Sequence, residues 1–123
     1  MGKPDNTGLR RILNAARFSA QGFSHAWRHE AAFRQELTIT LVLVPFALWL
    51  GQTPVERLLL IASCVLVLIV ELLNSAVEAV VDRFGGEQHE LSGRAKDMGS
   101  AAVFVSLGLV LATWMTIGWQ RFA

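Results

Sequence analysis

The chain has 123 residues and a net charge of +1; 53% of its residues are hydrophobic and 17% are charged. This composition excludes a disordered chain, which needs low hydrophobicity and high net charge. It also argues against a water-soluble domain, because so small a globule has too little interior to bury that much apolar side chain. The low net charge does not suggest a nucleic-acid partner. Cys64 is the single cysteine, which excludes an internal disulfide bond and a cysteine-based zinc site.

The first predicted element is an amphipathic surface helix over residues 8–34. Its apolar residues recur near helical spacing, and arginines occupy much of the remaining surface. Such a helix buries its apolar side in the membrane interface and places its basic side near anionic headgroups, and a plain anchor without chemistry has the same pattern. We expect no signal peptide, because residues 1–32 lack an apolar run followed by a cleavage pattern.

Three stretches that are poor in charge follow, and each predicts a transmembrane helix. Residues 37–55 and 98–120 contain no charged residue, and only Glu71 interrupts residues 58–77. A helix needs about 20 apolar residues to cross the hydrocarbon core of a bilayer. We therefore predict an all-α membrane protein with one membrane domain over residues 1–123. The predicted spans are residues 35–51, 55–84 and 94–120.

Turn-forming residues separate the predicted spans. Residues 51–54, Gly-Gln-Thr-Pro, predict a tight turn in which Pro54 opens the next helix. A pair of glycines at 85 and 86 ends the second span, and residues 87–93 form a polar loop. Pro45 is expected to kink the first span, which a membrane helix tolerates when its neighbours satisfy the freed carbonyl group.

The distribution of basic residues predicts the orientation in the membrane. Nine of the 11 Lys and Arg residues lie before the first span or near the loop after the second, whereas Arg57 and Arg121 lie on the opposite side. Cytoplasmic segments carry the excess of positive charge in membrane proteins. We therefore expect the N-terminus and the loop at 85–96 to face the cytoplasm.

The most informative residues lie in the sequence ELLNSAVEAVVD of the second span. Five polar residues there share one side of the helix, because their offsets of 3, 4, 7 and 11 match helical spacing. Ionisable residues inside membrane segments are costly and functional by default, although polar residues also act as a clamp between spans. The five residues are Glu71, Asn74, Ser75, Glu78 and Asp82.

The expected depth of Glu71 suggests a role in proton transfer. If hydrocarbon begins near Leu58 and lasts about 20 residues, Glu78 and Asp82 lie at the cytoplasmic interface. Glu71 then lies roughly 10 Å inside the core, at about 1.5 Å per residue. A carboxylate at this depth is suited to act as a base near neutral pH. The arrangement fits a lipid hydroxyl group that meets a water-soluble reactant.

The start of the third span predicts an anion site. Glycines, Ser92 and Lys96 open this helix, and helix N-termini attract anions. Lys96 could neutralise a phosphate, and Asp97 could hold a metal ion or a nucleotide. Glu30 could join Glu78 around Mg²⁺, which takes one or two carboxylates together with phosphate oxygens and water. In combination with the buried acid, these features indicate phosphoryl transfer.

The chain resembles the small integral-membrane diacylglycerol kinases of bacteria in three segments, which are EAAFRQE (30–36), ELLNSAVEAVVDR (71–83) and HELSGRAKDMGSAA (89–102). The similarity extends over residues 8–120. It implies a homotrimeric helical bundle in which each chain has three spans and a surface helix. It also implies a lipid kinase of the bacterial inner membrane that transfers the γ-phosphate of MgATP to diacylglycerol, giving phosphatidate at sites shared between neighbouring chains.

The resemblance implies roles for individual residues. Glu71 corresponds to the proton acceptor on the lipid hydroxyl, and Asn74 would orient the attacking oxygen or a carboxylate. Glu30 and Glu78 correspond to the carboxylates that bind the metal. The implied ATP-binding residues are Arg11, Phe18, Glu30, Glu78, Glu87, Gln88, His89, Lys96 and Asp97. The implied lipid-binding residues are Arg11, Ala15, Ser19, Trp27, Ala32, Phe33, Arg34, Gln35, Glu36, Trp49, Arg57, Glu71, Ser100 and Trp114.

Two residues depart from the family pattern. Phe18 stands where some members have tyrosine, which removes a hydroxyl group near the nucleotide, and Ala20 stands where some have tryptophan, which thins the apolar side of the surface helix. Neither residue belongs to the acidic side of the second span. We therefore expect activity to be kept and nucleotide affinity to be the property affected.

Other functions fit parts of the pattern. A kinase acting on a polyprenol such as undecaprenol would share the fold, and both lipids present a primary alcohol at the interface. A proton-coupled transporter would use Glu71 as a relay, but it predicts an internal repeat and an acid near the bilayer midplane. A structural scaffold gives no reason for so many acids on one side of a helix. The soluble-kinase motifs are absent, and His25 and His29 lack a third zinc ligand.

Overall fold

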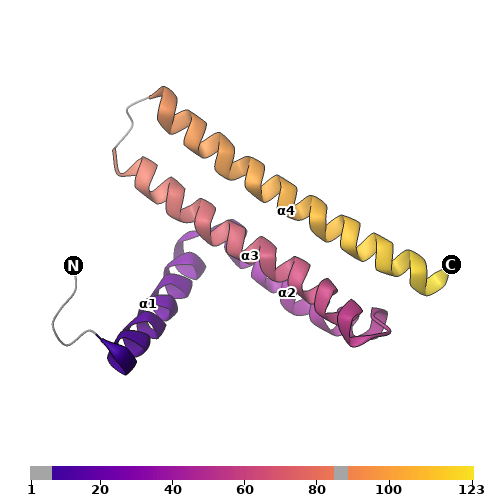
Figure 1. The fold of residues 1–123 in the computed structure, drawn as a ribbon. Coiled ribbons are helices and arrows are strands. Elements are labelled where there is room, and N and C mark those ends of the chain that lie inside the picture. Colours follow the sequence, from indigo (N-terminus) through magenta and orange to yellow (C-terminus); the bar gives the residue numbers. More distant parts are fainter. Residues whose placement is uncertain (1–6, 85–88) are drawn as a thin grey trace.

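Four helices make up the chain in the computed structural model, which describes residues 7–84 and 89–123. The helices are α1 (Gly8–His29), α2 (Ala31–Leu50), α3 (Pro54–Asp82) and α4 (Glu90–Phe122). Figure 1 shows α3 and α4 running side by side in opposite directions, while α1 leaves the bundle at a steep angle. Helices α2, α3 and α4 are long and apolar enough to cross a membrane, which confirms the predicted all-α class and three spans.

Helix α1 ends at His29, whereas the N-terminal helix was predicted to continue to residue 34. Glu30 is extended, with φ −118° and ψ 103°, and it separates α1 from α2. The guanidinium group of Arg34 donates to the carbonyl oxygens of Trp27 and Arg28, at 2.7 and 3.3 Å. These bonds satisfy carbonyl groups that the end of a helix leaves open, so the break is stabilised by a residue beyond it.

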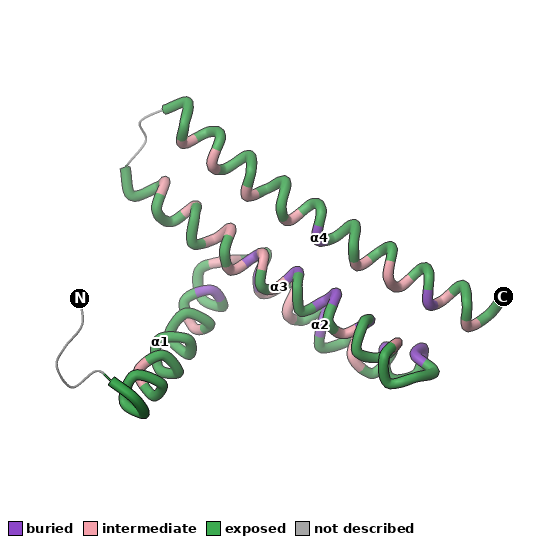
Figure 2. The backbone as a smooth tube through the Cα atoms, viewed as in Figure 1, coloured by how far each residue is buried: buried purple, intermediate pink, exposed green. Residues whose placement is uncertain are grey.

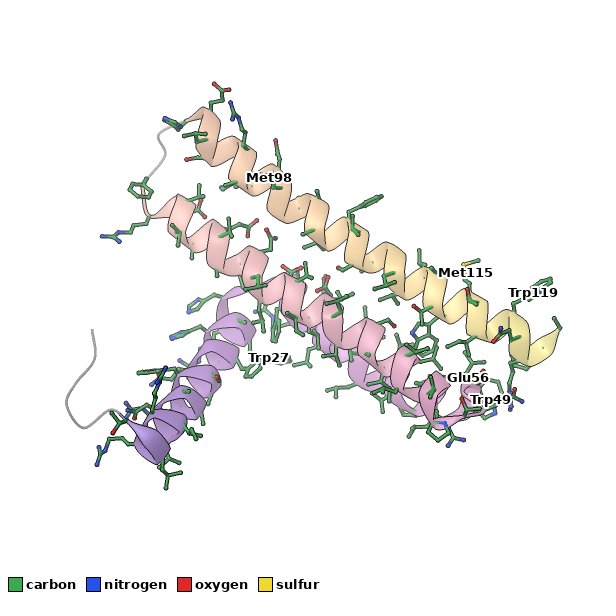
Figure 3. All side chains as sticks on the ribbon, in the orientation of Figure 1. Trp27, Trp49, Glu56, Met98, Met115 and Trp119 are labelled. Carbon is green, nitrogen blue, oxygen red and sulfur yellow. The ribbon has the colours of Figure 1, made fainter. Side chains whose placement is uncertain are left out.

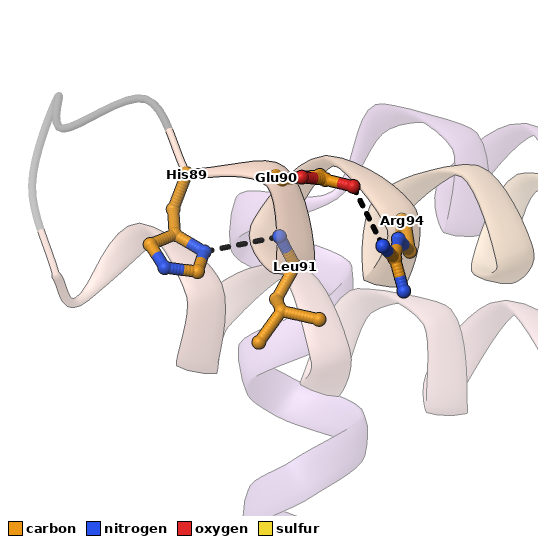
Figure 4. A network of polar contacts seen from close by, with 4 residues as sticks. All are labelled: His89, Glu90, Leu91 and Arg94. Atoms are coloured by element: carbon orange, nitrogen blue, oxygen red, sulfur yellow. Dashed lines mark hydrogen bonds and ion pairs between the residues drawn. The ribbon is translucent and has the colours of Figure 1, made fainter.

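Helix α4 begins at Glu90, four residues before the predicted start of the third span. The Nδ1 atom of His89 accepts a hydrogen bond from the backbone N–H of Leu91, at 3.0 Å, and so caps the helix. Arg94 forms an ion pair with Glu90 at 2.6 Å within the first turns (Figure 4). The polar segment that was predicted as loop is therefore partly helical.

The turn between α2 and α3 confirms the prediction for residues 51–54. Thr53 Oγ1 accepts from the N–H of Glu56 at 3.1 Å, and the Glu56 side chain accepts from the N–H of Gln52 at 2.7 Å. This is a reciprocal cap at the start of a helix. Arg57 Nε donates to the carbonyl of Gly51 at 3.0 Å, and a Cβ atom at position 51 would lie 2.6 Å from Arg57 Cγ. The turn therefore requires glycine there.

A small apolar core joins the spans at the end where α4 finishes. Ala47, Leu50, Leu60 and Ile117 are buried together, and Trp114 packs against them. The indole N–H of Trp114 donates to the carbonyl of Leu60 at 3.2 Å, which ties α4 to α3. Buried residues gather on α3, whereas α4 is mostly exposed (Figure 2). Large outward side chains, such as Met115 and Trp119 in Figure 3, suit a hydrocarbon environment.

Candidate functional site

Glu71 lies at the centre of the candidate site, in the middle of α3. Its side chain has 5% relative exposure, which makes it the only charged residue in the buried class among those the structure describes. A buried charge is costly unless other polar groups surround it. The residues around Glu71 therefore define the site.

Polar groups from three parts of the chain surround Glu71. The carboxyl group of Glu36, on α2, and the amide of Asn74, one turn further along α3, interact with the Glu71 carboxyl group. Glu30 and Glu78 are close enough to interact with it electrostatically. The structure thus brings together both predicted catalytic residues and both predicted metal carboxylates. Sequence reasoning assigned Glu36 to lipid binding and gave no sign that it pairs with Glu71.

The acidic residues do not form a complete metal cage. Among the described residues, no three His, Cys, Asp or Glu side chains lie close enough to hold a metal ion by themselves. Mg²⁺ does not need such a cage, because it is usually bound by one or two carboxylates together with substrate phosphates and water. Glu30 and Glu78 therefore fit Mg²⁺ that arrives with a nucleotide. The rings of His25 and His29 stack with their centroids 6.3 Å apart, and among the described residues no third zinc ligand lies close to them.

A groove of about 630 Å³ lies between α1 and α3, and we call it the α1–α3 groove. Most of its lining is apolar, and polar groups from both helices border it. Of the predicted site residues, Ser19 and Glu30 line it. The spacing of residues along one helix could not predict the other members, because the groove depends on the angle between two helices. These members are Gly22, Phe23, His25, Ala26, His29, Leu72, Ser75, Ala76 and Ala79.

Lys96, on α4, lies beside the C-terminal end of α3. Its Nζ atom is 2.8 Å from Oδ1 of Asp82. Both side chains are largely exposed, so the pair remains open to solvent and ions. Asp97 follows it on α4, and His89 caps this helix through Nδ1. The predicted nucleotide residues Glu87 and Gln88 lie outside the described residues.

The predicted nucleotide residues on α1 lie apart from the groove. Arg11 and Phe18 are exposed, and the guanidinium group of Arg17 lies 5.5 Å from the centre of the Phe18 ring. Arg11 precedes Glu30 by 19 residues, or about 28 Å along a helix. One chain therefore does not bring Arg11 to its own acidic residues.

The predicted lipid residues fall into two groups. Around the break between α1 and α2, Phe33 is buried with its ring 6.5 Å from that of Phe23, and Arg34 caps α1. The same region contains four further predicted lipid residues, which are Trp27, Ala32, Gln35 and Glu36. Two others, Ala15 and Ser19, lie nearer the start of α1, and Ser100 is exposed on α4.

The second group lies at the other end of the bundle. The ring of Trp49 is 5.8 Å from that of Phe122, and Arg121 lies over it at 5.4 Å. Trp49 and Trp119 lie near this end, whereas Met98 lies toward the opposite end (Figure 3). Arg57 is 14 residues from Glu71 on α3, about 20 Å along the axis.

Comparisons with known proteins show the family to which the chain belongs. Residues 17–118 match the family described as prokaryotic diacylglycerol kinase. The diacylglycerol kinase of Escherichia coli K12 is 53% identical over 118 residues, covering 96% of this chain and 97% of the relative. That of Pseudomonas aeruginosa is 58% identical over 111 residues, covering 90% of each chain. That of Haemophilus influenzae is 51% identical over 108 residues, covering 88% and 92%. The chain therefore belongs to the prokaryotic diacylglycerol kinase family and is a multi-pass membrane protein.

Proposed function

We propose that this protein transfers the γ-phosphate of MgATP to the hydroxyl group of diacylglycerol, giving phosphatidate and ADP. The observation that carries this proposal is the buried carboxylate of Glu71, which has the Asn74 amide beside it and Glu30 and Glu78 within electrostatic range. The names of the relatives support the same lipid and the same reaction type.

Glu71 is the proposed general base. It accepts the proton of the lipid hydroxyl as the oxygen forms a bond to the γ-phosphorus and the bond to the β-phosphate oxygen breaks. Asn74, which interacts with Glu71, is proposed to donate to the Glu71 carboxylate and hold it in one orientation. Positioning and electrostatics supply most of the acceleration in phosphoryl transfer. The reaction rate should therefore depend on the rigid placement of Glu71 and Asn74 more than on the number of catalytic side chains.

Glu30 and Glu78 are the proposed ligands of Mg²⁺. When bound, the ion neutralises charge on the phosphates. Two helical turns separate Glu71 from Glu78, about 10 Å along the axis. This separation leaves space for a phosphoryl group between the base and the metal carboxylates.

Lys96 and the N-terminal end of α4 are proposed to bind the nucleotide phosphates. A helix N-terminus carries partial positive charge, and Lys96 adds a full charge beside it. Arg11, Phe18, Glu87, Gln88, His89 and Asp97 complete the proposed nucleotide site.

The α1–α3 groove is the proposed entrance for the lipid. Its lining is mostly apolar, while Ser19, Ser75 and Glu30 provide polar groups along it. Such a mixture suits a molecule with acyl chains and a glycerol headgroup. The proposed lipid contact at Arg57 lies about 20 Å from Glu71 along α3, a distance that extended acyl chains can cover. Trp49 and Trp114 lie toward the same end of the bundle as Arg57.

A homotrimer in the inner membrane is proposed for the working enzyme, with the N-terminus in the cytoplasm and α1 as an amphipathic helix on the membrane surface. The distribution of basic residues supports this orientation. The separation of Arg11 from the acidic residues of its own chain supports sites shared between chains, because a neighbouring α1 can supply the missing arginine.

The purified protein in mixed micelles, with labelled ATP and either diacylglycerol or undecaprenol, tests the proposal. We expect label in phosphatidate and little in undecaprenyl phosphate. Label in undecaprenyl phosphate alone would show that the lipid substrate is undecaprenol and not diacylglycerol. Label in neither lipid would overturn the proposal. The Glu56→Gln variant is a matched control, because Glu56 lies at the far end of α3 and a glutamine keeps its capping oxygen.

A further inference from the structure

Asn74 of α3 and Gly99 of α4 form a close contact between the two helices. A Cβ atom added at Gly99 would lie 3.1 Å from Cγ of Asn74 and would collide with its Oδ1 atom. The amide therefore occupies the space that the side chain of any other residue would need. Gly22, Gly93, Gly108 and Gly118 have open space at the same position. Glycine within a helix is less stable than alanine, so its presence at position 99 has a steric reason.

The contact with Gly99 also explains why one oxygen atom of Asn74 lacks a conventional hydrogen bond. Oδ1 of Asn74 is buried and has no hydrogen-bond partner among the described residues. It lies over the backbone of Gly99, where a weak Cα–H···O contact is available to it. Because the amide group is planar, placing Oδ1 against α4 turns the NH₂ group back toward α3. Glu71 lies three residues before Asn74, on the same side of α3, and the two side chains interact.

We infer that Gly99 is a positioning residue, which acts through Asn74 to hold the Glu71 carboxylate in its reactive orientation. This inference rests on the proposed roles of Glu71 and Asn74. A side chain at position 99 pushes the Asn74 amide out of the gap between α3 and α4. The NH₂ group then no longer faces Glu71, and the carboxylate loses the donor that fixes it while it accepts the proton.

The test compares kcat and the KM for ATP in five forms of the full-length enzyme. These are the unchanged protein, Asn74→Ala, Gly99→Ala, the double variant Asn74→Ala/Gly99→Ala and the matched control Gly108→Ala. We expect Gly99→Ala to lower kcat by about a hundredfold, the effect of displacing a group near the reacting atoms by about 1 Å. The KM for ATP stays close to that of the unchanged protein, and Gly108→Ala keeps full activity.

The double variant separates positioning from a general loss of packing. Removing the Asn74 amide makes room for alanine at position 99, so the double variant should have the melting temperature of Asn74→Ala and no lower kcat. If Gly99→Ala fails to fold, recovery of folding with the kcat of Asn74→Ala in the double variant still supports the inference. Full kcat in Gly99→Ala, or losses that simply multiply in the double variant, would overturn it. Full activity in Asn74→Ala would instead overturn the proposed role of Asn74.

Discussion

Lys96 and Asp82 form an ion pair with 2.8 Å between Nζ and Oδ1, and the pair joins the last residue of α3 to the second turn of α4. It lies beside the proposed phosphate site, so Asp82 competes with the nucleotide for the ammonium group. Because both side chains are largely exposed, solvent screens the pair and it contributes little to stability. Its main effect should therefore appear in nucleotide binding.

Replacing Asp82 by asparagine should lower the KM for ATP. Lys96 then becomes free to bind phosphate, and the change should be up to about fivefold, the equivalent of an exposed ion pair. Initial rates at saturating lipid and varied ATP measure it. Glu56→Gln is the control, because it removes a carboxylate at the far end of α3, away from the proposed nucleotide site. A raised KM in Asp82→Asn would instead mean that Asp82 holds Lys96 in place for the nucleotide.

Replacing Glu71 by glutamine should lower kcat by at least about a hundredfold, because the general base is removed. ATP binding should remain, since Glu71 is two turns from the proposed metal carboxylate Glu78. Phosphatidate formation and equilibrium binding of ATP are measured on the same preparation, with Glu56→Gln as the control on α3. Activity close to that of the unchanged protein would exclude Glu71 as the base.

Replacing Glu30 or Glu78 by glutamine should shift the magnesium dependence of the reaction to higher concentration. A neutral amide is a weaker ligand for a hard cation than a carboxylate. Rates over a magnesium titration at fixed ATP measure the shift, and Glu56→Gln, at the far end of α3, should leave the titration unchanged. If Glu78→Gln also gives an unchanged titration, Glu78 does not bind the metal.

Mixing two inactive variants should restore part of the activity. Arg11→Ala removes a proposed nucleotide contact, and Glu71→Gln removes the base from a distant part of the same chain. In a mixed trimer, some sites combine the intact Arg11 of one chain with the intact Glu71 of another. The variants are unfolded, mixed, refolded together and assayed. Activity no greater than the sum of the separate variants would place each site within one chain.

Periodicity and charge predicted much of the fold. The runs without charge located the three spans, and the sequence Gly-Gln-Thr-Pro located the turn at 51–54, because both depend on local properties. The break at Glu30 could not be predicted in this way. No glycine or proline marks it, and the carbonyl groups that it frees are satisfied by Arg34, on the far side of the break.

The part of the site that lies on a single helix could also be predicted, because it depends on local spacing. Helical spacing placed Glu71 and Asn74 on one side of α3, and the structure brings Glu30 near them. The pairing of Glu36 with Glu71, the contact of Asn74 with Gly99 and the α1–α3 groove all depend on how separate helices pack. Such contacts leave no periodic signal in the sequence.

The break between α1 and α2 is a single residue long, and that residue carries one of the proposed metal carboxylates. Glu30 is thus both the residue at which the chain changes direction and the residue that carries the charge. Swinging α1 away from the bundle would carry the Glu30 carboxylate with it and alter its distance from Glu78. The orientation of α1 and the geometry of the proposed metal site are therefore coupled through one backbone position.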